Sequence, residues 1–200
     1  LQSTADFTLN SNRGIALGSN HGTINVDGST TLTYGGIIAG SNNLTMSGNG
    51  TLLLSGINTY SGTTTISAGT LKISGQLGSG TYSSNIINNG ILQHSSSSNQ
   101  TLSGVISGSG SLTKDGSGEL IISGINSYSG STTISAGSIR ISADSGLGSA
   151  PSSATSGHLV LSNGSILKTT ATFTLNSNRG ITLASGTGYF KPSSSTELTY

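Results

Sequence analysis

The sequence predicts an all-β protein that folds as a right-handed parallel β-helix, a β-solenoid of roughly eight to ten coils. Three observations favour this fold: an internal repeat, short runs of alternating polar and apolar residues, and a composition rich in glycine and poor in charge. We expect residues 1–200 to form one continuous solenoid segment of a longer tandem array.

The repeat is the strongest of the three observations. Leu44–Ser74 returns as Leu112–Ser142 without a gap, and the copies agree at about 20 of 31 positions with an offset of roughly 68 residues. Stacked repeats bury a core only against their neighbours, so the copies predict coils that lie on top of one another. If one coil takes roughly 20 to 23 residues, the offset corresponds to three coils.

A longer repeat encloses the shorter one. Ala5–Tyr34 returns as Ala171–Tyr200, with agreement at about 18 of 30 positions and an offset of roughly 166 residues. This offset corresponds to seven or eight coils. The chain therefore spans a little more than one long period of the expected array.

Composition supports the same fold class. Of the 200 residues, 6% are charged and 4% aromatic, 31 are glycine and none is cysteine, whereas globular domains carry about 25% charge. Disorder is the alternative for a chain this rich in Ser and Gly, but it usually needs a high net charge, and the net charge here is +1. Disulfide bonds do not hold the fold.

The expected strands follow in order along the chain. Apolar and polar residues alternate at 23–26 and 31–34, the period-2 pattern of a strand with one buried face, and Asp27-Gly28 predicts the turn between them. The repeat copies predict further strands, each ended by glycine. Ser/Ala-rich residues 147–157, with Pro151, predict a loop or protruding turn before strands at 158–161, 165–168 and 172–175. No segment shows convincing helical spacing.

The corners of the coils have candidate structural residues. Glycines that end the strands are expected at positive φ, where a side chain is strained. Asn58 and Asn126 hold one repeat position, where an amide side chain can satisfy the backbone of a corner. The predicted corner residues are Asn58, Asn126, Gly62, Gly130, Gly69 and Gly137.

Tyr60 and Tyr128 are candidate surface-contact residues. They share one repeat position, so they could project as a regular outward row that stacks on sugars. The alternative is that each tyrosine covers a corner of its coil.

Candidates for catalysis and metal binding are few. His21, His94 and His158 are expected to be isolated surface residues, and zinc needs three or four converging ligands. Asp115 and Glu119 are the closest acidic pair, but the first copy has Ser47 and Thr51 in their places. We predict no catalytic residue, no metal and no cofactor. Seven basic residues against six acidic ones predict no basic patch and no nucleic-acid partner, and no apolar run predicts a membrane-spanning segment.

One part of the repeat resembles a known family. Gly108–Ser142, with its G-x-G at Gly108 and Gly110 and its SGxNxYxG at Ser123–Gly130, resembles the autotransporter-associated β-strand repeat of bacterial autotransporter passenger domains. The first copy departs from that pattern at Asn42 and Met46. The resemblance implies a surface or secreted location and a chain that assists its own export by folding progressively outside the cell.

These observations lead to three functional hypotheses. The first is a non-enzymatic stalk or adhesin shaft that holds a binding tip away from the cell, or that itself contacts glycans or other surface molecules. The second is self-association, side to side or end to end, into fibres, aggregates or a surface layer, because an uncharged surface has little repulsion to prevent it. The third is a polysaccharide-acting enzyme on the same scaffold, which the missing carboxylate cluster disfavours.

Overall fold

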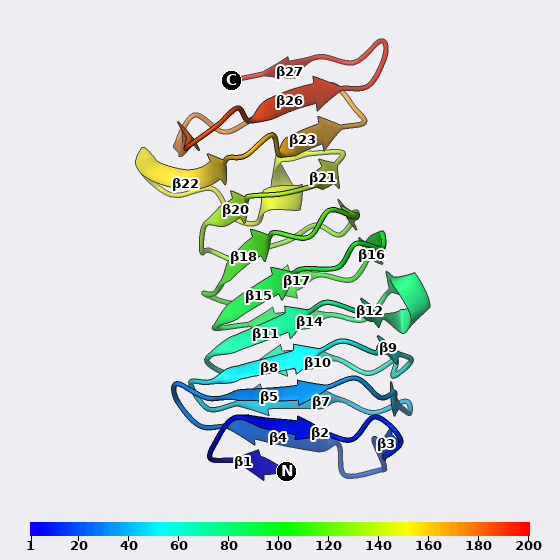
Figure 1. Cartoon of the computed structure of the whole chain (residues 1–200). Coiled ribbons are helices and arrows are strands. Elements are labelled where there is room, and N and C mark those ends of the chain that lie inside the picture. Colours follow the sequence, from blue (N-terminus) through cyan, green and yellow to red (C-terminus); the bar gives the residue numbers. More distant parts are fainter.

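Short strands recur along the whole chain and stack in parallel, and in the central coils their residues alternate between buried and more exposed positions. The computed structural model describes residues 1–200, and the coils rise from the N-terminus at one end to the C-terminus at the other (Figure 1). The largest sheet has nine strands, one from each coil. The predicted all-β parallel solenoid is confirmed, with nine coils.

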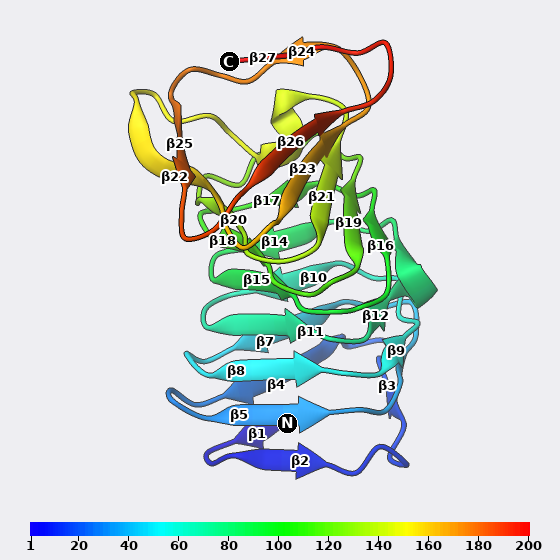
Figure 2. The same cartoon turned by 45° about the horizontal axis from the view of Figure 1, so that its top comes forward.

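The strands form three faces around the interior, which Figure 2 shows from a tilted view. The first face is a six-stranded sheet of β1 (Gln2–Ser3), β4 (Gly22–Val26), β7 (Leu44–Ser47), β10 (Thr64–Ile66), β14 (Ile86–Asn88) and β17 (Ile106–Ser107). The second face is the nine-stranded sheet of β2 (Phe7–Leu9), β5 (Thr31–Tyr34), β8 (Thr51–Leu54), β11 (Thr70–Ile73), β15 (Ile91–His94), β18 (Ser111–Lys114), β20 (Thr132–Ile134), β22 (Thr155–Leu161) and β25 (Arg179–Leu183).

The third face changes along the molecule. Its upper part is a six-stranded sheet of β13 (Thr81–Tyr82), β16 (Gln100–Leu102), β19 (Glu119–Ile122), β21 (Ser138–Ile141), β23 (Ile166–Thr169) and β26 (Tyr189–Pro192). In the lower coils the short pairs β3 (Ile15–Ala16) with β6 (Ile38–Ala39), and β9 (Ile57–Asn58) with β12 (Gln76–Leu77), take this place. A separate pair, β24 (Phe173–Thr174) with β27 (Leu198–Thr199), follows the third-face strands β23 and β26 in the last two coils.

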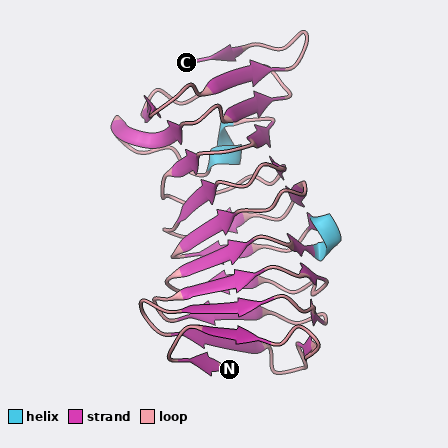
Figure 3. Ribbon diagram, viewed as in Figure 1, coloured by secondary structure: helices cyan, strands magenta, loops and turns pink.

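Helical structure is limited to two 3₁₀ turns, η1 (Gly78–Gly80) and η2 (Asp144–Leu147), shown in cyan in Figure 3. The second turn ends at Leu147, the first residue of the expected loop 147–157, and β22 begins at Thr155, so the last three residues of that region belong to a strand. A register shift interrupts β22 between Thr155 and Leu159. No helix in the chain has the length and apolar character needed to cross a membrane.

The core is a set of interior ladders. Within β8 and its neighbours every second residue is buried, and the register places Leu32, Leu52, Leu71, Leu92 and Leu112 one above another on successive coils. Thirty-two buried apolar residues form one cluster that runs from Leu17 to Leu175. Because each side chain packs on its equivalents in the coils above and below, the apolar period of the strands builds a continuous core.

The two copies of the short repeat lie on different faces, which corrects the estimate of three whole coils between them. Hydrogen bonds between neighbouring coils join residues 20 positions apart at Ile38 and Asn58, and again at Ile106 and Asn126. The first copy begins with β7 on the first face, and the second begins with Leu112 in β18 on the second face. The offset is therefore three coils plus one face.

Candidate functional site

Asp115 and Glu119, the closest acidic pair in the sequence, contact different side chains. The Asp115 carboxylate accepts hydrogen bonds from Gln93 Nε2 at 2.7 Å and from Ser95 Oγ. The Glu119 carboxylate instead contacts Arg140 Nε at 2.9 Å and the ammonium group of Lys168. Asp115 directly follows β18 and Glu119 begins β19, so the two carboxylates flank one turn but have different partners. No group of three or more His, Asp or Glu side chains converges on a common point.

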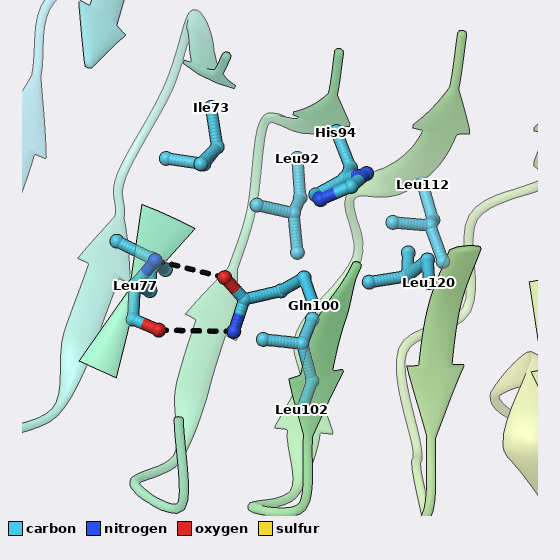
Figure 4. A pocket seen from close by; sticks show the side chains of 8 residues that line it. All are labelled: Ile73, Leu77, Leu92, His94, Gln100, Leu102, Leu112 and Leu120. Carbon is cyan, nitrogen blue, oxygen red and sulfur yellow. Dashed lines mark hydrogen bonds between the residues drawn. The ribbon is translucent and has the colours of Figure 1, made fainter. Parts of the chain in front are cut away.

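Two of the three histidines are buried, which corrects their expected surface position. His94 lies inside the solenoid on β15 and His158 on β22, whereas His21 is exposed at a positive-φ turn. Figure 4 shows His94 among leucine side chains around a cavity of about 10 Å³, beside the hydrogen bonds between Gln100 and the Leu77 backbone. A cavity of this size holds no more than about one water, so it is no ligand site.

Lys114 is also buried, directly beside His94 on the next coil. Its ammonium group donates to the Gly116 carbonyl and, at 3.4 Å, to the Ala136 carbonyl. Burial, with a smaller opposing effect from Asp115, lowers the pKa of Lys114 to about 8. Burial, and then the charge of Lys114, lower the pKa of His94 to about 4. Both groups are enclosed, so they affect stability and cannot meet a ligand.

Tyr60 and Tyr128 do not form an outward row. Both side chains are 0% exposed, and their hydroxyl groups hydrogen-bond to Thr64 Oγ1 at 2.7 Å and Thr132 Oγ1 at 2.8 Å. Burial raises the pKa of Tyr128 to about 12. The sugar-stacking role is excluded by burial, because a hydroxyl bonded inside the coil fixes each ring toward the interior.

Asn58 and Asn126 satisfy corner backbone groups from inside the solenoid, as predicted. Asn58 Oδ1 accepts from the Ile38 amide at 3.1 Å, and its Nδ2 donates to the Gln76 carbonyl at 3.3 Å. Asn126 accepts from the Ile106 amide at 2.8 Å and donates to the Gly146 carbonyl at 3.2 Å. Each side chain therefore joins the coil below to the coil above.

The corner glycines are required for two different reasons. Gly69 and Gly137 have φ of 68° and 63°, as expected. Gly62 and Gly130 do not have positive φ; a Cβ at Gly62 would lie 2.3 Å from the Asn42 carbonyl carbon, and one at Gly130 would lie 2.3 Å from the Gly110 oxygen. At these two positions glycine is needed because neighbouring coils stack too closely for a Cβ. The prediction that these two glycines adopt positive φ was wrong.

The third face carries a polar groove of about 370 Å³ that the sequence did not predict. Arg140, Lys168 and Lys191 line it together with Glu119. The even balance of basic and acidic residues indicated no basic patch, but stacking brings three cations onto one face. Sequence spacing could not reveal this, because the coils that separate the three residues differ in length.

Comparison with known proteins gives two partial matches. The model of the passenger-associated-transport-repeat family matches residues 44–73 and 112–141, so the chain carries two of these repeats, which confirms the resemblance found in the sequence. A 62-residue stretch is 42% identical to the adhesin BmaC autotransporter of Brucella suis biovar 1 (strain 1330). That stretch is 30% of this chain and 2% of the relative, so this chain spans a small part of the relative's length. No solved structure matches the chain.

Proposed function

We propose that this chain, with its two passenger-associated-transport-repeats, is a segment of the rigid shaft of a structural or adhesive autotransporter passenger at a bacterial cell surface. The observation that carries the proposal is that both repeats are integral coils of one solenoid. They supply strands to all three faces and share one core. The repeats are therefore the building material of the rod and are not appendages to it.

The energetics of stacking suit a shaft. Each additional coil adds about 4.8 Å of length, and its interior leucines and isoleucines are buried by the coils on either side. A solenoid of this kind gains stability from each neighbour and can be extended without a change in its core. We infer that residues 1–200 act as one segment of such a rod and that the segment has no enzymatic activity.

The test uses intact bacteria that carry this sequence. An antibody to residues 1–200 is applied before and after protease treatment of intact cells, and the surface is imaged by electron cryo-tomography. We expect labelled thin rods that protease removes. Labelling only after the cells are lysed, or rods that the antibody does not recognise, contradicts the proposal.

Lateral self-association is the second candidate function, and exposed aliphatic residues favour it. Ile37 and Ile57 lie on successive coils at one corner and are 52% and 53% exposed. Val105 and Ile125 lie 68 residues further along the chain, at the offset of the short repeat, and Ile125 is 78% exposed. Sedimentation velocity of the chain should then show oligomers that an Ile57→Ser, Ile125→Ser double variant loses. A monomer at high concentration contradicts this candidate.

A further inference from the structure

Three cations form a ladder on the third face near the C-terminal end. Arg140 on β21 pairs in register with Lys168 on β23, and Lys168 pairs with Lys191 on β26. Neighbouring strands are about 4.8 Å apart, so the three backbone positions repeat at that spacing along the axis of the rod. These are three of the seven basic residues of the chain.

A single carboxylate organises the lower part of this ladder. Glu119 Oε1 lies 2.9 Å from Arg140 Nε, and Glu119 Oε2 contacts Lys168 Nζ. Burial by itself would raise the pKa of Glu119, but the hydrogen bond and charge of Lys168, with the charge of Arg140, lower it. Glu119 stays ionised and holds the two cations in place.

The charges of the groove do not cancel. One carboxylate is shared by two cations, and Lys191 has no acidic partner among the ion pairs of the chain. The groove of about 370 Å³ between these side chains also includes Thr170 and Ser193, and its lining is polar. Its chemistry fits an anionic ligand with hydroxyl groups.

An exposed aromatic ring lies beside the upper end of the ladder. Tyr189 precedes Lys191 by two residues on β26, so the two side chains point to the same outer side of the strand. The ring is 53% exposed, and its hydroxyl accepts a hydrogen bond from Thr187 Oγ1 at 3.2 Å. A ring held in this way presents an apolar face with one polar end, which suits contact with the C–H face of a sugar.

We propose that this groove binds an acidic glycan that lies along the axis of the rod. Carboxylate or sulfate groups of the glycan pair with Lys191 and with the Arg140–Lys168 pair, while a sugar ring packs on Tyr189. The inference rests on the proposed function and names the ligand class that the shaft contacts. Nucleic acid fits less well, because single strands need a row of stacking aromatics and a longer cationic track.

The test measures binding of the 200-residue chain to polygalacturonate, heparin and neutral dextran by biolayer interferometry. We expect binding to the first two glycans, none to dextran, and weaker binding as salt is raised, because ions screen exposed charges. Preference for polygalacturonate assigns carboxylate as the recognised group, and preference for heparin assigns sulfate. Absence of binding to both overturns the inference.

Matched variants separate this groove from general charge attraction. Lys191→Gln and Arg140→Gln are each expected to weaken binding about tenfold, and Tyr189→Ser to weaken it with an unchanged salt dependence. Lys72→Gln removes the same charge from the second face, where its register neighbours are Leu53 and Gln93, and should have no effect. An equal loss in the Lys72 variant overturns the inference.

Failure of this inference is distinguishable from failure of the proposed function. If Lys191→Gln passengers are displayed as rods on cells and the wild-type chain binds no acidic glycan, the groove is not a binding site and the shaft proposal stands. If the protein is absent from the surface, the shaft proposal fails whatever the glycan binding shows.

Discussion

At the scale of single residues, Lys114 and His94 occupy neighbouring positions of one interior ladder, between Ile73 and Ile134 of the adjacent coils. Both have pKa values lowered mainly by burial. Burial disfavours the charged form of a base, so protonation of either side chain costs more free energy in the folded chain than in the unfolded chain. The first repeat copy avoids this cost, because it has buried Met46 where the second has Lys114.

Replacing the buried lysine should stabilise the protein. We expect Lys114→Met to raise the free energy of unfolding at neutral pH by about 1–2 kcal/mol, since it removes a buried charge at the cost of two hydrogen bonds. Urea unfolding measures the change, and Lys72→Met on the outer side of β11 is the control.

The advantage of Lys114→Met should depend on pH. The folded pKa of Lys114 is about 8, against 10.5 for the free side chain. Between these values the unfolded chain binds a proton that the folded chain does not, so wild-type stability rises with pH. The difference in the free energy of unfolding between Lys114→Met and wild type should therefore shrink as pH rises from about 8 to 10.5. A constant difference contradicts the assignment.

His94 should make the protein sensitive to mild acid. Its folded pKa is about 4, against an ordinary value of 6.5, so stability is present above the ordinary value and is lost as pH falls toward the folded one. Burial and Arg179 also lower the pKa of His158, which acts in the same direction.

We expect His94→Leu to retain about 2 kcal/mol more of its stability than wild type when pH falls from about 7 to about 5. Thermal unfolding at the two pH values measures this. His21→Asn, at an exposed position with φ of 62°, is the control. Parallel losses in wild type and the Leu variant exclude His94 as the source.

At the scale of elements, each corner is held by a buried amide and a close glycine contact. Asn58 joins three coils through backbone hydrogen bonds to Ile38 and Gln76. Gly62 lets its corner approach the coil below more closely than any side chain permits. Strand alternation determines which residues face inward, and these corners determine where the chain bends.

Removing the buried amide should weaken the stack of coils. Asn58→Ala leaves the Ile38 amide and the Gln76 carbonyl without their partner, and we expect a loss of about 2–3 kcal/mol in the free energy of unfolding. Urea unfolding tests this against Thr59→Ala, at an exposed neighbouring position. Equal stability of the two variants contradicts the role of Asn58.

At the scale of the whole molecule, the short repeat advances by one face between its copies. The first copy supplies β7 and β8 to the first and second faces, and the second supplies β18 and β19 to the second and third. The exposed residues Ile57 and Ile125, which share one repeat position, therefore lie on different sides of the rod. This arrangement suits a shaft that is chemically alike all around better than a flat layer.

The coil, and not the repeat, is the unit that can be removed. Deletion of residues 91–110 joins Gly90 to Ser111, which is the register partner of Ile91, and should leave a cooperative solenoid one coil shorter. Deletion of residues 91–100 removes about half a coil and turns the following strands away from their faces. Circular dichroism and limited proteolysis should show a folded first variant and a disrupted second. Equal disruption contradicts the modular description.

The sequence by itself determined the fold class, the inward positions of most strands and the corner role of Asn58 and Asn126, because these depend on local period and turn chemistry. Only the tertiary structure decided that Tyr60, Tyr128 and His94 are buried, and that Arg140, Lys168 and Lys191 share one groove. The physical reason is that neighbours above and below a residue lie a full coil away in the chain. Small differences in coil length accumulate, and they decide which face each residue reaches.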